Sequence, residues 1–261
     1  MHYDAITHIL FDLGNVLVGL NRISNASVLC PALRAADQPE FAIVTDYECG
    51  RVSTETFLTE APRVLGLDIQ PEALQAEFQR IVGEWYPQTP ELLDALRQSY
   101  RLGCLSNTNP LHIGALEQRG PHLELLHDCF LSHEIGCMKP APSAYEYVLT
   151  AWDVPAHHIL FIDDRPENVE GATRAGMQAI EAQGPAAVAD ALRPLLESKH
   201  CHHQHYTSPL QKPDAKDCVP PECRLFPTME GGRGAQRRQA SDRKQRSGNP
   251  LPPPDICKTY E

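Results

Sequence analysis

Short apolar segments that each lead into polar, reactive side chains restrict the fold of this chain more than any other feature. The first segment, residues 6–11, is followed directly by Asp12 and then by Gly14. Three later segments lead into Ser106-Asn107-Thr108, Lys139-Pro140 and Asp163-Asp164. Apolar runs of this length are typical of buried parallel strands. Open α/β sheets bind their ligands beyond the carboxyl ends of such strands, so we expect these side chains to meet along one sheet edge.

Helical patterns alternate with these segments as far as residue 198. The sequence predicts strands at residues 6–11, 102–105, 129–131 and 158–162. It predicts helices that start at Pro90, run from Pro142 to Trp152, run from Glu167 to Ala175, and cover residues 187–196. Strands that alternate with helices indicate an α/β protein with a doubly wound parallel sheet.

Residues 19–86 break the alternation, because they carry helical periodicity and no strong strand. Ser53 resembles a helix N-cap, and Pro71 is suited to the first turn of a helix. A segment of this length is too long for a loop within a compact domain. We therefore expect a separate helical lobe inserted after the first strand.

Residues 199–261 differ in character from the rest of the chain. They contain nine of the 23 prolines and almost no apolar periodicity. Such a segment cannot bury enough apolar surface to offset the entropy lost on ordering. We predict a disordered C-terminal tail and exclude it from the fold.

Charge and cysteine usage exclude several classes of partner. Residues 199–261 hold 11 Lys/Arg and 7 Asp/Glu, so residues 1–198 carry a net charge of -15 within a total of -11. An acidic body repels nucleic acid and anionic lipid. The sequence has no apolar run long enough to span a membrane and no recognisable secretion signal. Nine cysteines without a CxxC pair indicate reduced thiols in a cytoplasmic protein.

The four polar segments, in this order, resemble the motifs of the haloacid-dehalogenase superfamily. The matching stretches are Phe11-Asp12-Leu13-Gly14-Asn15-Val16-Leu17, Leu105-Ser106-Asn107-Thr108-Asn109, Gly136-Cys137-Met138-Lys139-Pro140 and Phe161-Ile162-Asp163-Asp164-Arg165-Pro166-Glu167-Asn168. Each motif alone is weak evidence, whereas all four in order are specific. The resemblance covers about residues 1–190. It implies a Rossmann-like core formed by residues 1–18 and 87–198, with residues 19–86 as the helical cap.

The resemblance also implies a role for each matched residue. Asp12 would attack phosphorus and form an aspartyl-phosphate intermediate that water then hydrolyses. Ser106 and Asn107 would donate hydrogen bonds to the phosphoryl oxygens, and Lys139 would neutralise the charge that develops. The expected Mg²⁺ ligands are carboxylates and one backbone carbonyl, supplied by Asp12, Gly14, Asp163 and Asp164. Asn168 would support the acid pair from the following helix.

The subgroup is indicated by the Asp-Leu-Gly-Asn-Val form of the first motif and by the stretch from Glu48 to Ser53. Both resemble the subgroup that contains α-D-glucose-1-phosphate phosphatase. This resemblance implies a Mg²⁺-dependent phosphatase for a small phosphorylated metabolite, with a sugar phosphate favoured.

Gly14 departs from the pattern of most phosphatases in the superfamily, which carry a second Asp at this position. Loss of a general acid–base group costs about 10²–10⁴-fold in rate. In one interpretation, Glu48 of the cap or a bound water replaces it. In a second, the chain is a dehalogenase, whose leaving halide needs no proton. In a third, it is a non-catalytic phosphate-binding module. For His112, near the second motif, two positions are open, close to the site or on the surface of a helix, and we expect the surface position.

Overall fold

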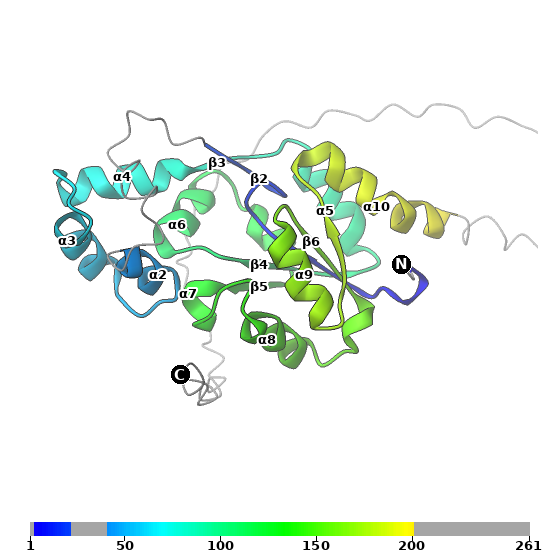
Figure 1. The fold of residues 1–261 in the computed structure, drawn as a ribbon. Coiled ribbons are helices and arrows are strands. Elements are labelled where there is room, and N and C mark those ends of the chain that lie inside the picture. The colour runs from blue at the N-terminus through cyan, green and yellow to red at the C-terminus, as the bar shows by residue number, and fades with distance from the viewer. Residues whose placement is uncertain (1–2, 22–40, 201–261) are drawn as a thin grey trace, which may run out of the picture. The chain divides into compact units, whose positions relative to one another are not determined.

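A five-stranded parallel sheet forms the centre of the protein in the computed structural model, which describes residues 3–21 and 41–200 (Figure 1). The strand order is β5-β4-β1-β6-β7. The strands are β1 (His8–Phe11), β4 (Arg101–Ser106), β5 (Asp128–Leu131), β6 (Ile159–Asp163) and β7 (Gln178–Glu181). Every neighbouring pair is parallel, which confirms the predicted α/β class. The sequence analysis missed only the edge strand β7 among these five.

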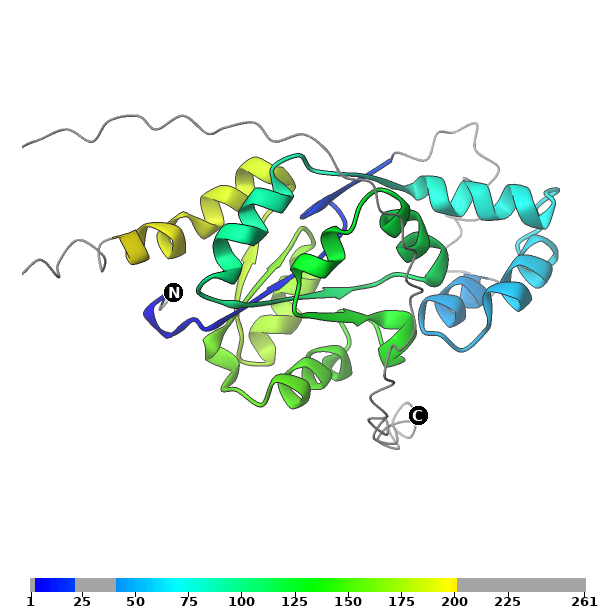
Figure 2. The same ribbon diagram turned by 180° about the vertical axis from the view of Figure 1, so that it is seen from behind.

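Helices cover both faces of this sheet. In Figures 1 and 2, α5 (Thr89–Arg97) and α10 (Gly184–His200) lie on one face, and α8 (Pro142–Trp152) and α9 (Pro166–Arg174) lie on the other. Alternate side chains of each strand point to opposite faces. Ile9 and Phe11 of β1 therefore pack into one apolar cluster, and Leu10 packs into the other. The sheet is buried on both sides, as the continuous apolar runs predicted.

Short elements complete the core. They are the 3₁₀ helices η1 (Tyr3–Ala5), η3 (His122–Leu125) and η4 (Ala156–His158), the one-turn helix α7 (Ser132–Ile135), and α6 (Pro110–Gln118). The amide side chain of Asn109 caps α6 by accepting a hydrogen bond from the backbone of His112 at 3.1 Å. This cap satisfies one of the free N–H groups at the helix start.

Within its described residues, 19–21 and 41–86, the inserted segment contains three helices, α2 (Ala42–Glu48), α3 (Thr54–Val64) and α4 (Pro71–Ile81). The Ser53 side chain caps α3, and Pro71 occupies the first turn of α4, as the sequence predicted. Tyr47, Phe57 and Phe78 are buried in a cluster of their own, with the Tyr47 and Phe57 rings stacked at 4.2 Å. Burial of such aromatic side chains stabilises the three-helix unit.

The expectation that residues 19–86 lack strands was wrong. Strands β2 (Val18–Leu20) and β3 (Val82–Trp85) pair antiparallel at the two ends of the segment. Each strand is too short to produce a readable alternation, and only pairing between distant parts of the chain stabilises them. This two-stranded ribbon fixes where the chain leaves the core and where it returns.

The described residues all belong to one compact unit, Met1–Ser208. The predicted tail falls almost entirely on residues outside the described ranges. Within those ranges, none of the helices combines the length and apolar character needed to cross a membrane.

Candidate active site

A buried ion-pair triad lies at the carboxyl edge of the sheet, at the point where the strand order reverses. Lys139 Nζ donates to Asp12 Oδ1 at 2.8 Å and to Asp163 Oδ2 at 2.6 Å. Asp12 directly follows β1, and Asp163 is the last residue of the neighbouring β6. The side chains of Lys139 and Asp163 are 1% and 0% exposed. Two segments that are far apart in the sequence therefore meet at the position where doubly wound sheets bind ligands.

The charges of this triad depend on one another. Burial raises the pKa of Asp12, and the nearby ammonium group of Lys139 partly offsets that rise. Burial by itself lowers the pKa of Lys139, but Asp12 and Asp163 outweigh it, and the pKa of Lys139 is raised. Lys139 is therefore a permanent cation at this edge of the sheet.

Asp163 is held rigidly from three sides. Besides Lys139, it accepts hydrogen bonds from the backbone N–H of Arg165 at 2.9 Å and from the Asn168 amide at 3.0 and 3.1 Å. Asn168 thus contacts Asp163, as the sequence analysis expected. Because these donors occupy both of its oxygens, Asp163 serves to position Lys139 as well as to supply negative charge.

Asn15 orients the second carboxylate of the acid pair, a role that the sequence analysis missed. Asn15 Nδ2 donates to Asp164 Oδ2 at 2.9 Å. The backbone of Asn15 is left-handed, with φ of 56°. Asn tolerates this conformation better than most residues. An Asn directly after a Gly in a strand-end turn is the only signal in the sequence that could have indicated it.

Asn107 anchors the loop that carries Lys139. Its amide donates to the Lys139 carbonyl and accepts from the Lys139 N–H, both at 2.8 Å. The end of β4 and the start of α7 are joined in the same way, since Ser132 Oγ bridges the N–H and C=O of Thr108 at 2.9 Å each. Ser106 is buried and lines the same cavity as Asp12. The expected phosphate contacts of Ser106 and Asn107 remain predictions.

Three carboxylates at this edge form a group suited to a hard cation. Asp12, Asp163 and Asp164 each offer an oxygen, and these atoms lie within 4.8 Å of one another. Mg²⁺ is bound through one or two carboxylates together with water and substrate oxygens. Asp164 is only half buried, so it leaves the group open on one side. The residues present therefore fit Mg²⁺. The backbone carbonyl of Gly14 remains a predicted ligand.

A cavity of about 400 Å³ opens over these residues and extends to the inserted segment. Its walls include apolar side chains of that segment and of α6, among them Leu20, Ile81 and Leu116, together with Glu48. Glu48 is the last residue of α2. Burial raises the pKa of Glu48 from 4.5 to about 7, and no charge or hydrogen bond from the described residues offsets the shift. Glu48 therefore keeps its proton to a much higher pH than an exposed glutamate does.

The expectation that His112 occupies a surface position was wrong. Its side chain is buried and lines the same cavity, and its ring stacks on Phe78 of α4 at 6.1 Å. Burial lowers the pKa of His112 to about 4, so the ring is neutral. The prediction failed because α6 packs against the core on one side and against α4 on the other, which a single helix sequence does not reveal.

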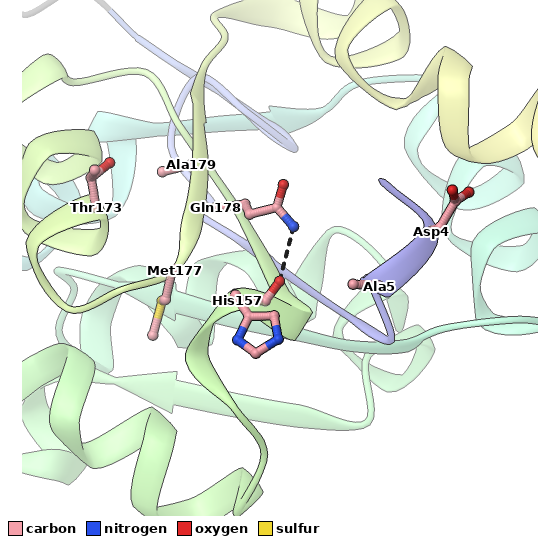
Figure 3. A pocket seen from close by; sticks show the side chains of 7 residues that line it. All are labelled: Asp4, Ala5, His157, Thr173, Met177, Gln178 and Ala179. Atoms are coloured by element: carbon pink, nitrogen blue, oxygen red, sulfur yellow. Dashed lines mark hydrogen bonds between the residues drawn. The ribbon is translucent and has the colours of Figure 1, made fainter. Parts of the chain in front are cut away.

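A second and larger cavity, of about 700 Å³, lies beside the start of β7 (Figure 3). Gln178 and His157 line it, joined by a hydrogen bond of 2.9 Å, along with Met177 and Thr173. Asp4 is its one carboxylate. No lysine and no second acid of the described residues line this cavity, so it lacks the cluster of acids and lysine found at the smaller one.

Comparisons with known proteins agree with this geometry. The family described as haloacid dehalogenase-like hydrolase matches residues 6–176. D-ribitol-5-phosphate phosphatase from Bacteroides thetaiotaomicron is 24% identical, covering 74% of this chain and all of the relative. Sesquiterpene phosphatase astK from Aspergillus oryzae is 25% identical, covering 72% and 95%. The fold is similar to that of a crystallised Bacteroides thetaiotaomicron enzyme of the same family, solved with magnesium and inorganic phosphate. That likeness has a TM-score of 0.59, 22% identity, and coverage of 69% of this chain and 95% of the other.

Proposed function

Because the chain belongs to the haloacid dehalogenase-like hydrolases, we propose that it is a Mg²⁺-dependent phosphatase that hydrolyses a small phosphorylated metabolite. The observation that carries the proposal is the contact of Lys139 with both Asp12 and Asp163 in the cavity that Ser106 also lines. One cation between two acids positions a carboxylate nucleophile and offsets the charge of an incoming phosphate. Two of the relatives named above are phosphatases, which supports this reaction over other hydrolytic chemistry.

Asp12 is the nucleophile in this proposal. Its carboxylate attacks phosphorus, the bond to the leaving oxygen breaks, and an aspartyl-phosphate forms. Lys139 stays within hydrogen-bond distance of Asp12 and stabilises negative charge on the transferring group. Ser106 donates a hydrogen bond to a phosphoryl oxygen, and Asn107 fixes the backbone that carries Lys139. Water then attacks the phosphorus and releases phosphate.

Asp12, Asp164 and the carbonyl of Gly14 would hold Mg²⁺, with Asp163 behind them. When bound, the ion would supply positive charge that neutralises the phosphate oxygens. Asn15 positions Asp164 for this role, and Asn168 positions Asp163. A related enzyme crystallised with magnesium and inorganic phosphate is consistent with the assignment.

Glu48 is the general acid in this proposal and replaces the carboxylate that Gly14 lacks. A carboxylic acid with a pKa near 7 can donate a proton to the leaving oxygen at neutral pH and afterwards accept one from water. Glu48 lines the cavity from the inserted segment, which we propose to be the cap (residues 19–86) on a core of residues 1–18 and 87–198.

The substrate is proposed to be a phosphate monoester of a small alcohol. A sugar or polyol phosphate is favoured by the ribitol-5-phosphate phosphatase relative. Membership of the α-D-glucose-1-phosphate phosphatase subgroup remains a prediction from the motifs. A cytoplasmic location is part of the proposal and rests on the cysteine pattern.

A substrate screen tests the proposal. Purified protein is assayed for phosphate release from a panel of sugar, polyol and isoprenoid phosphates, with Mg²⁺ and with EDTA. We expect Mg²⁺-dependent turnover that Asp12→Asn abolishes. Chloride release from 2-chloropropionate without Mg²⁺ would instead indicate a dehalogenase. Phosphate binding without turnover of any monoester would indicate a binding module.

A further inference from the structure

Two free cysteines face each other across neighbouring strands, outside the site described above. Cys104 of β4 and Cys129 of β5 are direct partners in the parallel register. Both side chains belong to the apolar cluster on the same face of the sheet. Neighbouring strands lie about 4.7–4.9 Å apart. That spacing falls within the roughly 4.4–6.8 Å between Cα atoms that a disulfide requires.

The two thiols differ in access to solvent. Cys104 is fully buried in a central strand, whereas Cys129 is half-buried on the edge strand β5. The neighbouring Cys104 thiol lowers the pKa of Cys129, which favours its thiolate. A half-buried thiol with a lowered pKa beside a second, protected thiol has the arrangement of a reactive and a resolving cysteine.

We propose that Cys129 and Cys104 form an oxidisable dithiol that hydrogen peroxide converts into a disulfide between β5 and β4. The Cys129 thiolate attacks the peroxide, the O–O bond breaks, and hydroxide leaves, which gives a sulfenic acid on Cys129. The Cys104 sulfur then attacks the Cys129 sulfur, and the S–O bond breaks. The Cys104 proton goes to the departing hydroxide as water. In sum, the two thiols lose two electrons and two protons, and one peroxide becomes two waters.

Cys137 provides a reference thiol in the same protein. It is also half-buried, but it packs against the cluster on the opposite face of the sheet, and burial raises its pKa. Exposure alone would make Cys129 and Cys137 react alike. Pairing with Cys104 is what sets Cys129 apart.

Peptide mapping of the full chain tests this inference. The reduced protein is treated with a slight excess of hydrogen peroxide, blocked with iodoacetamide under denaturing conditions, and digested without reductant. We expect a cross-linked pair of peptides containing Cys104 and Cys129, with the loss of two hydrogens, while Cys137 is recovered alkylated. Cys104→Ala should abolish the cross-link and slow the oxidation of Cys129, because the neighbouring thiol that lowers its pKa is gone. Cys137→Ser should still form the cross-link.

Peptide mapping of the unmodified protein tests the inference even if the Cys104→Ala variant does not fold. Recovery of Cys104 and Cys129 as separate alkylated peptides, at a peroxide dose that oxidises Cys137, would overturn the inference. A sulfenic acid that persists on Cys129 beside an intact Cys104 thiol would also overturn it, because the two sulfur atoms then cannot meet.

Discussion

Asn15 and Asp164, 149 positions apart in the sequence, are joined by a hydrogen bond of 2.9 Å between the Asn15 amide and Asp164 Oδ2. The bond crosses from the turn after β1 to the turn after β6. It ties the loop of the proposed nucleophile to the most open carboxylate of the proposed metal site. Hydrogen bonds to ligating carboxylates orient them and tune metal affinity.

Asn15→Gly should therefore weaken Mg²⁺ binding by about 10–100-fold. Glycine keeps the left-handed backbone that Asn15 adopts, so the change removes the amide without backbone strain. Titration of phosphatase activity with Mg²⁺ measures the effect. Asn21→Gly is the matched control, because the Asn21 amide donates to the Arg80 carbonyl away from the acids. If both variants need the same Mg²⁺ concentration for activity, Asn15 does not contribute to metal binding.

Lys139→Met should lower the free energy of unfolding by about 3–5 kcal/mol, because the change leaves two buried carboxylates without their cation. Urea denaturation in EDTA measures the loss. Mg²⁺ should restore part of it, since the ion compensates the same carboxylates. Arg174→Met is the control, because the Arg174–Glu170 pair is exposed and should contribute no more than about 1 kcal/mol. Similar stabilities for both variants would contradict the arrangement.

Glu48→Gln should reduce kcat for an alkyl phosphate by about 10²–10⁴-fold. It should affect p-nitrophenyl phosphate much less, because nitrophenolate leaves without a proton. For the unmodified enzyme, activity on the alkyl ester should fall as the pH rises through about 7, where Glu48 loses its proton. Glu55→Gln, on the exposed face of α3, is the control. If the ratio of kcat for the alkyl phosphate to kcat for p-nitrophenyl phosphate is unchanged in Glu48→Gln, Glu48 is not the acid.

The raised pKa of Glu48 also links stability to pH. The folded protein holds this proton between pH 4.5 and about 7, whereas the unfolded chain has largely released it. The stability that comes from this proton is therefore fully present below pH 4.5 and is lost as the pH rises through about 7. The unfolding free energy of Glu48→Gln should fall less steeply across this range than that of the unmodified protein. Parallel pH profiles would mean that Glu48 is ionised in the fold.

Gly50→Ala should displace Glu48 from the cavity. Gly50 has φ of 67°, and an added Cβ would lie 2.0 Å from the carbonyl oxygen of His133 in α7. The clash forces α2 away from α7 and carries Glu48 with it. Gly66→Ala is a matched control, because Gly66 has φ of 64° and nothing within 4 Å of an added Cβ. We expect both variants to lose about 1 kcal/mol of stability from backbone strain. Only Gly50→Ala should also lose activity on alkyl phosphates, and equal activities would contradict the expectation.

Four of the five strands and the position of Asp12 at the end of the first were readable from the sequence, because buried parallel strands are short, continuous apolar runs. The pairing of β2 with β3 was not readable, since three or four residues show no period. The burial of His112 depends on contacts of α6 with both the core and α4. The role of Asn15 depends on a partner near the other end of the core. In each case the missing information lay in contacts between distant segments, which local patterns do not encode.

Covalent trapping at position 12 tests the central proposal most directly. The enzyme is mixed with a turned-over phosphate monoester and Mg²⁺, quenched during turnover, and reduced with borohydride, which converts an aspartyl-phosphate into homoserine. We predict homoserine at position 12 in the digested protein, and none after the same treatment without substrate. A reference phosphatase, treated in the same way, shows that the conditions trap an acyl phosphate. If the enzyme turns over its substrate but only aspartate is recovered at position 12, the result would contradict a covalent role for Asp12.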